Sequence, residues 1–343
     1  MRFEQKKDAG LFDWMELEGK IAGRETSLKR LGKTINWEAL ADVLMARLEY
    51  RSGAQGGRPA KDPGLMLKLC VLQSLYDLSD EEAEWQATDR MSFRCFLGLS
   101  AADTVPDART LWKFKERLGP EGVQAIFDAF VNQMRAQGLE PRKGKMIDAC
   151  IVEAPRQRNS AEENAAIKKG ERPASFDENP ARGRQKDTDA RWTKKRGRSY
   201  FGYKNHTKVD VRSKMIEGYT VTPASRHDSQ EVEALVKEGD GYLLADAAYA
   251  GEPVEALLQE RGVESYIHEK GVSGHPLSRT QKSFNRMKSK LRARVEHVYG
   301  WMRGRGQRLV RSIGLERARR CIGMCNLVYN MSRWTYLKRG AGC

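Results

Sequence analysis

Hydrophobic residues in the first part of the chain recur at the spacing of a helix. Between Asn36 and Tyr50, leucine and valine residues return every three or four positions, and Asn36 is suited to cap the helix that they predict. Capping residues and prolines at helical starts predict further helices over 63–77, from 79 to about 90, and over 92–97, 108–118 and 120–138. We therefore expect residues 1–138 to form an all-helical domain, with an irregular arm up to residue 34 that holds a short helix near Leu11–Glu18.

Two neighbouring helices of this region bear on its role. The pair 65–76 and 81–90 has the spacing of a helix-turn-helix, although generic helical packing explains the same spacing equally well. The region offers apolar helix faces and no visible chemistry. These properties suit a domain that recognises DNA or forms a dimer.

The pattern changes to strands beyond residue 139. Six apolar residues lie between Lys145 and Glu153, and Pro155 ends the run, which predicts a strand buried on both faces. Residues 161–198 are polar and basic with little periodicity, so we expect a long mobile loop or insertion there. Further strands are predicted over 200–211, 214–223, 241–245 and 265–268, and helices over 228–237, 252–261, 281–303 and 315–337. This order is that of a ribonuclease-H-like fold, so we expect residues 139–343 to form an α/β domain with a mixed sheet flanked by helices.

Three acidic residues stand out in this second part. Asp148 lies inside the first apolar strand, where a carboxylate is costly unless it is paired or binds a metal. Asp246 follows a later buried strand, and Glu296 lies within a strongly basic helical stretch. Each also has an ordinary interpretation: a backbone hydrogen bond at a strand end for Asp148, a helix cap for Asp246 and a salt bridge to Arg292 for Glu296.

The strand order favours a joint role for the three carboxylates. The first and fourth strands are neighbours in a ribonuclease-H-like sheet, so Asp148 and Asp246 should lie side by side, and the later helix can place Glu296 across them. Converging carboxylates repel each other unless a cation neutralises them, and oxygen ligands suit Mg²⁺ or Mn²⁺. Two such ions about 3.5–4 Å apart can promote displacement at a phosphodiester. We therefore predict a site with two divalent ions per catalytic centre.

The charge of the chain points to an acidic partner. Its net charge is +15, and the stretch from Arg279 to Arg320 alone carries fourteen Lys or Arg residues and two acids, a net charge of +12. Such clustering indicates nucleic acid. We expect phosphate contacts from a set of basic residues in and beyond this stretch, namely Lys288, Lys290, Arg292, Arg294, Arg303, Lys194, Lys195 and Arg196.

Several other side chains have two interpretations that the sequence leaves open. Lys204 and His206 alternate on a predicted strand, where they can contact DNA or belong to an exposed sheet face. His297 is a candidate for a DNA contact or a structural role. Trp192 and Trp301 flank basic runs and can stack on an extruded base, but core packing is the commoner role.

Composition excludes some classes of protein. No apolar stretch approaches the about 20 residues of a membrane span, and the N-terminal residues lack the apolar core of a signal peptide. We therefore expect no membrane partner and a cytoplasmic, nucleoid-associated location. The six cysteines are scattered without disulfide-framework or zinc-finger spacing.

Five stretches carry a resemblance to a known family. They read Asp-Pro-Gly-Leu-Met-Leu-Lys from Asp62, Ile-Asp-Ala-Cys-Ile-Val-Glu-Ala-Pro from Ile147, Phe-Gly-Tyr-Lys from Phe201, Ala-Asp-Ala-Ala-Tyr from Ala245, and the basic stretch around Glu296. In these, the chain resembles DDE-type bacterial insertion-sequence transposases of the insertion sequence 5 family, from about residue 60 to the last helix. Related enzymes carry a Tyr-Arg-Glu-Lys signature on that stretch. Arg292 and Glu296 match its Arg and Glu, while Ser289 and Arg303 stand at the Tyr and Lys positions.

The resemblance implies a function and its residues. It places the three catalytic carboxylates at Asp148, Asp246 and Glu296, and implies binding to terminal inverted repeats and target DNA by a homodimer or higher homo-oligomer. Metal-dependent strand cleavage and strand transfer would follow. A catalytically silent DNA-binding protein or repressor derived from a transposase is the main alternative, and a ribonuclease-H-like repair nuclease has less support from the large helical region.

Overall fold

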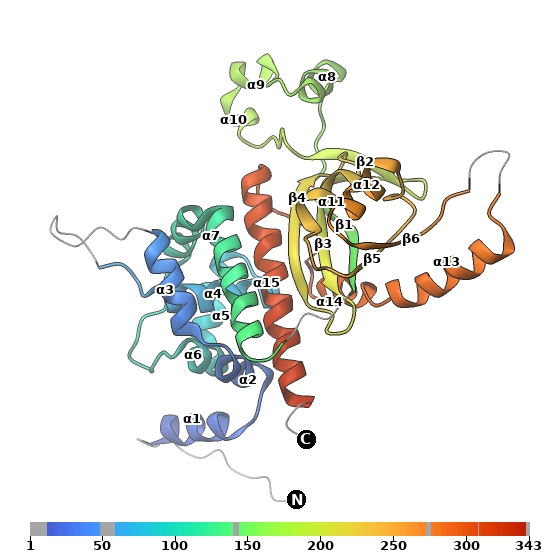
Figure 1. Cartoon of the computed structure of the whole chain (residues 1–343). Coiled ribbons are helices and arrows are strands. Elements are labelled where there is room, and N and C mark those ends of the chain that lie inside the picture. The colour runs from blue at the N-terminus through green and yellow to red at the C-terminus, as the bar shows by residue number, and fades with distance from the viewer. Residues whose placement is uncertain (1–11, 49–58, 140–143, 272–275, 308, 341–343) are drawn as a thin grey trace, which may run out of the picture.

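The computed structural model describes residues 12–48, 59–139, 144–271, 276–307 and 309–340. Figure 1 shows a group of N-terminal helices on one side, a sheet with its helices on the other, and the long helix α15 (Leu315–Gly340) between them. Two parts project from this body: the small helices α8–α10 beyond the end of the sheet, and helix α13 to its side.

The N-terminal helices follow the predicted pattern closely. They are α1 (Asp13–Gly23), α2 (Ser27–Thr34), α3 (Trp37–Leu48), α4 (Pro63–Tyr76), α5 (Asp80–Asp89), α6 (Met91–Leu97) and α7 (Ala108–Ala136). The arm expected up to residue 34 is wrong in part, because α2 is a regular helix whose Leu28 and Leu31 are buried. The two helices predicted around Pro120 form one kinked element, with Gly119 at φ 60°.

The sheet is mixed. Its strands are β1 (Lys145–Glu153), β2 (Arg191–Lys195), β3 (Arg198–Asp210), β4 (Ile216–Pro223), β5 (Tyr242–Ala245) and β6 (Glu264–Ile267). Strand β1 runs antiparallel to β3 on one side and parallel to β5 on the other, β6 follows β5, and β2 and β4 pair with successive parts of β3. The first strand and the strand before Asp246 are therefore neighbours, and the sheet with its flanking helices fits the predicted ribonuclease-H-like fold.

The polar segment after β1 differs from the expected loop. It folds into α8 (Ala161–Lys169), α9 (Ala174–Glu178) and α10 (Pro180–Gly183), followed by β2. Phe176 is fully buried there, and the guanidinium groups of Arg172 and Arg182 lie 5.9 and 5.7 Å from its ring. Glu163 is also buried and bonds Arg182 and Ser175, both at 2.8 Å. A single aromatic residue and paired charges are thus enough to order this segment.

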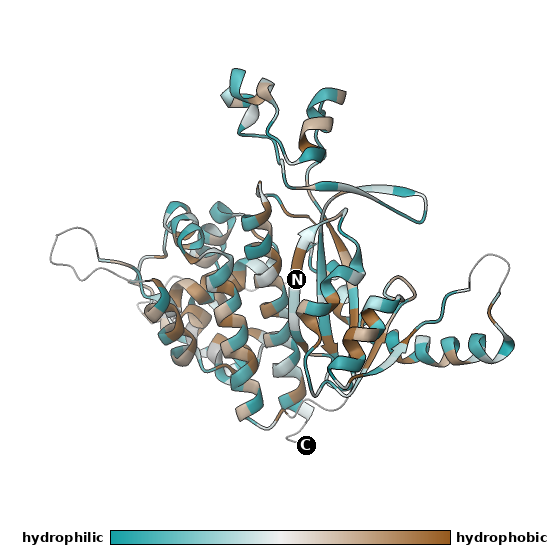
Figure 2. Cartoon of the chain, turned by 45° about the horizontal axis from the view of Figure 1, so that its top comes forward, coloured by the Kyte–Doolittle hydropathy of each residue, from teal (hydrophilic) through white to brown (hydrophobic). Residues whose placement is uncertain are grey.

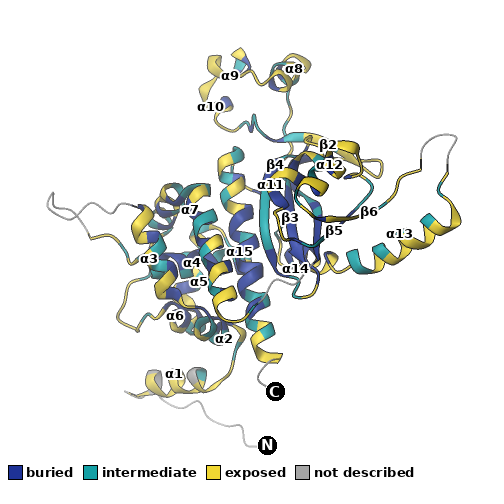
Figure 3. Ribbon diagram, in the orientation of Figure 1, coloured by how far each residue is buried: buried dark blue, intermediate teal, exposed yellow. Residues whose placement is uncertain are grey.

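Two helical layers cover the sheet. On one face, the short helices η1 (Asp228–Glu231), α11 (Val232–Leu235) and α12 (Glu252–Glu260) surround a core that includes Ile147 and Leu243. His227, not Asp228, caps the first of these turns. On the other face lies α15, whose buried residues appear dark blue in Figure 3.

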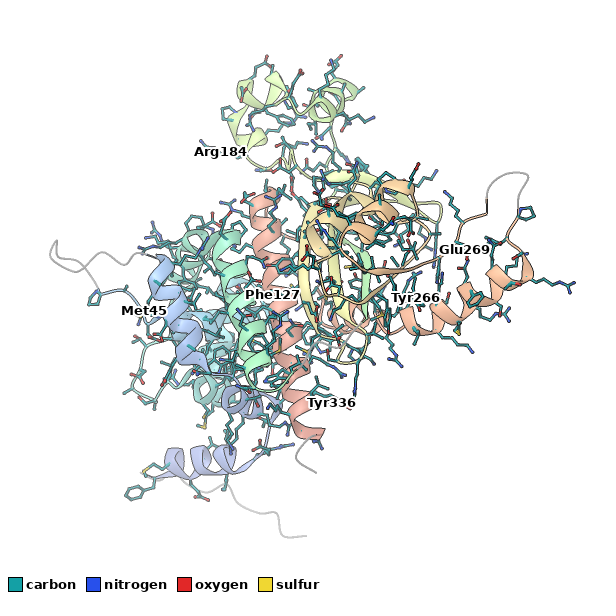
Figure 4. All side chains as sticks on the ribbon, viewed as in Figure 1. Met45, Phe127, Arg184, Tyr266, Glu269 and Tyr336 are labelled. Atoms are coloured by element: carbon teal, nitrogen blue, oxygen red, sulfur yellow. The ribbon has the colours of Figure 1, made fainter. Side chains whose placement is uncertain are left out.

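Helix α15 joins the two parts of the molecule. Its Asn326 exchanges amide hydrogen bonds with Asn205 of β3 at 2.8 and 3.1 Å, and its other face contacts α4 and α7. Apolar residues of the N-terminal helices, α15 and the sheet form one continuous core, in which Phe127 of α7 meets Tyr219 of β4 (Figure 4). In Figure 2, where hydrophobic residues are brown, these helices carry brown stretches on the sides that pack together. A division into separate domains near residue 138 stays a prediction.

Within the described residues, we find no helix with the length and apolar character that a bilayer crossing requires.

Candidate active site

Two of the three predicted carboxylates lie side by side. Strands β1 and β5 are parallel, with Lys145 opposite Leu243 and Met146 opposite Leu244. Continuing this register places Asp148 next to Asp246, which follows the last residue of β5. Strand β5 ends at Ala245, so the carboxylate of Asp148 lies beside the end of that strand.

One guanidinium group lies between these carboxylates. Nη2 of Arg292 is 4.0 Å from Oδ2 of Asp148 and 3.9 Å from Oδ2 of Asp246. The second oxygen of each carboxylate accepts a backbone hydrogen bond, from Ala149 at 2.9 Å and from Ala248 at 2.8 Å. The strand-end hydrogen bond considered for Asp148 is therefore present, while Asp246 caps a turn and not α12, whose N-cap is Gly251.

Burial makes Asp148 an unusual acid. Removal from water raises its pKa to about 6, the nearby charge of Asp246 adds to this, and Arg292 and Lys195 oppose it. A carboxyl group with this pKa is ionised for the most part at neutral pH and takes up its proton as the pH falls toward 6, and a cation bound between the two aspartates would favour its ionised form.

Glu296 does not join the pair in this structure. The single helix expected over 281–303 is broken into α13 (Arg279–Arg292) and α14 (Glu296–Gly304). Amide groups from Val295 to Val298 bond carbonyls three residues earlier, a tighter 3-10 arrangement that turns Glu296 away from Arg292. The Glu296 side chain is 63% exposed and lies 3.4 Å from Arg303, so the predicted salt bridge to Arg292 is wrong.

The donor set fits a metal ion in part. Asp148 and Asp246 supply converging carboxylate oxygens, the ligands that Mg²⁺ and Mn²⁺ prefer. In the described part of the chain, no three His, Cys, Asp or Glu side chains are grouped closely enough to hold an ion. The two aspartates thus fit a divalent cation, and Glu296 does not complete the set in this arrangement.

Two buried tyrosines belong to the surroundings of the aspartate pair. The hydroxyl of Tyr299 donates to the backbone carbonyl of Asp148 at 2.7 Å and lies 2.8 Å from the hydroxyl of Thr207. Tyr249 is fully buried, and burial followed by the charges of Asp228, Asp148 and Asp246 raises its pKa well above the usual value. Burial also raises the pKa of Tyr299 well above the usual value, so both phenols stay neutral. Each lies three residues beyond a predicted carboxylate, and Tyr249 closes the Ala-Asp-Ala-Ala-Tyr stretch.

The predicted contacts on β3 need correction. His206 is fully buried, its Nε2 lies 2.9 Å from the Thr222 hydroxyl, and burial lowers its pKa to about 4. The ammonium group of Lys204 lies 2.8 Å from Asp228 and donates to the carbonyl of Arg226. These side chains belong to the layer between β3 and η1, so neither a DNA contact nor an exposed sheet face describes them.

The other predicted cations lie on the hairpin of β2 and β3, on α13 and just beyond the end of α13. Lys194, Lys195 and Arg196 are exposed on the hairpin between β2 and β3, and Lys195 is close enough to lower the pKa of Asp148. Lys290 is exposed on α13, which buries no residue. The remaining cations are positioned by backbone carbonyls, Lys288 by Ile267 at 2.8 Å and Arg294 by Val211 at 3.3 Å.

Comparisons with known proteins bear on the family of the chain. A family profile described as a transposase DDE domain matches residues 147–331, and a second, described as a transposase domain, matches residues 15–117. Among solved structures, the chain is similar to a piggyBac transposase in a synaptic complex with hairpin DNA. The identity is 11% and the TM-score 0.45, over 95% of this chain and 76% of the other.

Proposed function

The chain belongs to the family of DDE-type transposases, whose DDE domain covers more than half of it, and we propose that it moves an insertion sequence by cutting and joining DNA. In this proposal it binds the terminal inverted repeats, cleaves phosphodiesters there and transfers the freed strands to target DNA. It would do so as a cytoplasmic, nucleoid-associated protein, within the insertion sequence 5 family. The placement of Asp148 beside Asp246 is the observation that carries the proposal.

The catalytic residues in this proposal are Asp148, Asp246 and Glu296. Asp148 and Asp246 would hold Mg²⁺ or Mn²⁺, with Glu296 joining them once the segment 293–295 rearranges, and two ions per site are proposed. When bound, these ions supply Lewis-acid stabilisation of charge at phosphorus. Without them, Arg292 offsets the repulsion between the two aspartates.

The chain's own cations would position the DNA. Around the aspartate pair, exposed or carbonyl-held Lys and Arg groups offer phosphate contacts that neutralise the backbone in any sequence. The set proposed for this role is Arg292, Arg303, Lys288, Lys290, Arg294, Lys194, Lys195 and Arg196. Arg303 can also release Glu296 when a phosphate competes for its guanidinium group, because phosphate binds arginine through the same paired geometry as carboxylate.

The substitution Asp148→Asn tests the proposal. It keeps the size of the side chain and the backbone hydrogen bond but removes the charge, so strand cleavage should fall below detection while binding to terminal repeats stays nearly unchanged. The matched control is Asp128→Asn, which alters an exposed aspartate on α7. Cleavage at the normal rate by the Asp148 variant would contradict the assignment.

A catalytically silent DNA-binding protein is the second candidate. The separation of Glu296 from the aspartates favours it, because a missing third carboxylate would abolish metal-assisted cleavage. The two functions differ in one measurement: the unmodified protein, incubated with terminal-repeat DNA and Mg²⁺ or Mn²⁺, either yields nicked product or only a complex.

A further inference from the structure

A second hollow lies away from the aspartate pair, between the N-terminal helices and the end of α15. It encloses about 570 Å³ and is formed by α2, the end of α4, α14, α15 and Lys214 from the turn between β3 and β4. Ligand pockets commonly enclose about 300–1,000 Å³, so its size suits a small molecule or a single unit of a polymer. None of the residues assigned above to cleavage lines it.

Basic side chains surround this pocket without acidic partners. Its five cations are Arg30, Lys214, Arg305, Arg333 and Arg339, and no acidic residue is among the described residues that line it. In the part of the chain that the structure describes, none of the five lies within ion-pair distance of an Asp or Glu. As far as the described residues go, their charge is therefore uncompensated and available to an anion.

Backbone contacts hold several of these cations in place. Nε of Arg333 donates to the carbonyl of Ser213 at 2.8 Å, and Nη1 of Arg305 donates to that of Leu75 at 3.4 Å. Lys214 has a left-handed backbone at φ 61°, and its carbonyl accepts a hydrogen bond from the Tyr329 hydroxyl at 2.7 Å. The cations are thus oriented before any ligand arrives, which reduces the entropy lost on binding.

The cations also act on one another. Partial burial and the charges of Arg333 and Arg294 lower the pKa of Lys214. Like charges held this close together destabilise the empty pocket. An anion of two charges would relieve that repulsion, which agrees with a phosphate group as the occupant.

Aromatic rings form the rest of the lining. Trp301 packs edge-on against Tyr329 with ring centroids 5.4 Å apart, and the guanidinium of Arg305 lies 4.5 Å above the Trp301 ring. Nearer the solvent, Arg333 lies 5.1 Å from the ring of Tyr336, whose side chain is 64% exposed at the end of α15 (Figure 4). Flat rings and guanidinium planes are the surfaces on which nucleobases stack.

We propose that this pocket binds a nucleotide, with its phosphate on the arginine and lysine groups and its base against Tyr336 or the Arg305 plane. A phosphate ion would bind the cations but make no contact with the aromatic rings. An acidic peptide would likewise not stack on these flat surfaces. The nucleotide can be free in solution or an unpaired residue of a DNA strand. The second source rests on the proposed function, and it is consistent with the position of His297, which lines the pocket and directly follows Glu296.

The double variant Arg30→Gln/Arg333→Gln tests the phosphate part. Binding is measured by calorimetry with inorganic phosphate and deoxyadenosine monophosphate, and by fluorescence anisotropy with a short single-stranded oligonucleotide. We expect at least a tenfold loss of nucleotide affinity. Lys338→Gln is the matched control, because Lys338 lies on the same helix but stacks on Trp334 outside the pocket. Unchanged affinity in a folded double variant, or no saturable nucleotide binding by the unmodified protein, overturns the proposal.

The variant Tyr336→Ala tests the base part and is safe for folding, because this side chain is largely exposed. It should weaken binding of the monophosphate several-fold and leave inorganic phosphate unaffected, and an equal effect on both ligands contradicts base stacking. The affinities for the free monophosphate and for single strands that carry or lack one base are then compared. This comparison shows whether the pocket takes a free nucleotide or an unpaired residue of a DNA strand. All assays are repeated in Asp148→Asn protein, where retained nucleotide binding keeps this inference separate from any failure of the cleavage proposal.

Discussion

At the scale of single residues, the main feature is a buried carboxylate, Asp148, whose ionised form is disfavoured by burial. Asp148 has a pKa of about 6 because burial outweighs the favourable charge of Arg292. In the unfolded chain, the same group has an ordinary pKa of 3.8. When the pKa of a group is higher in the folded state, the folded protein loses stability as the pH rises from the unfolded pKa to the folded pKa. The ionised Asp148 therefore destabilises the metal-free protein above about pH 6.

The first prediction follows from the upward shift of the Asp148 pKa on folding. Asp148→Asn should stabilise the metal-free protein above about pH 6, by at most about 3 kcal/mol, since each pKa unit is worth about 1.36 kcal/mol. The gain should vanish below the ordinary carboxyl pKa. Denaturant unfolding across this range measures it, with Asp128→Asn as the exposed control. Addition of Mg²⁺ should narrow the difference by stabilising only the unmodified protein, and a gain equal at all pH values would contradict the prediction.

A second prediction concerns the guanidinium between the aspartates. Arg292→Gln removes the largest influence that lowers the pKa of Asp148, so this pKa should rise further. The acid limb of the cleavage rate against pH should then move to higher pH, while Lys237→Gln, which changes a distant exposed lysine, should leave it in place. An acid limb that stays where it is would show that another group limits the rate.

At the scale of elements, the break between α13 and α14 decides where the third carboxylate points. Four consecutive i to i−3 hydrogen bonds, donated by the amides from Val295 to Val298, tighten residues 292–298, and α13 extends from the sheet without burying a side chain (Figures 1 and 3). An exposed helix with six Lys or Arg residues and no acid gains stability when it lies on a polyanion.

The prediction at this scale concerns salt. Neutralising Lys288, Lys290 and Arg294 together to Gln should weaken binding to all DNA sequences alike and reduce the slope of log K against log salt by about 2.7, or 0.9 for each lost phosphate contact. Binding is measured at several salt concentrations, with Lys237→Gln/Lys338→Gln as the control outside the cluster. An unchanged slope would show that the cluster faces away from DNA.

At the scale of the whole molecule, the described part of the chain exposes large aromatic side chains and a projecting lobe. Trp85 and Trp112 are 61% and 46% exposed on α5 and α7, and the α8–α10 lobe projects beyond the sheet. Two identical ends of an element are most simply held by a symmetric pair of subunits, with one active site for each transferred strand. The N-terminal helices and the lobe are our candidates for the contact between the two subunits. They are also our candidates for binding the DNA end that the other subunit holds.

The corresponding prediction is that subunits pair on DNA. Light scattering of the Asp148→Asn protein with terminal-repeat DNA should give the mass of two or more subunits with two ends. The double substitution Trp85→Ser/Trp112→Ser should reduce this mass without altering the circular dichroism, because both rings are largely exposed. A strand-joining complex of one subunit and one end would contradict pairing.

The sequence alone determined most of the elements and the pairing of the first strand with the strand before Asp246. Apolar runs, caps and prolines act locally, so the helices from Trp37 to Ala136 and the strands β1 and β5 lie where their patterns predict. Because parallel neighbours keep one register, two aspartates at matching depths had to meet, and Asp148 and Asp246 do. The polar lobe was harder to predict because one buried ring, Phe176, holds it together, and a single aromatic residue leaves no periodic signal.

Only the tertiary structure decided what depends on contacts between distant segments. The helical pattern continues through Ala293, so nothing local foretold the tightened turn that directs Glu296 to Arg303. The burial of His206 came from the cover that η1 places over β3, which strand alternation does not encode. The cationic pocket likewise joins Arg30 to Arg333, more than 300 residues apart in sequence, and such a meeting is set by the packing of α15 against the N-terminal helices.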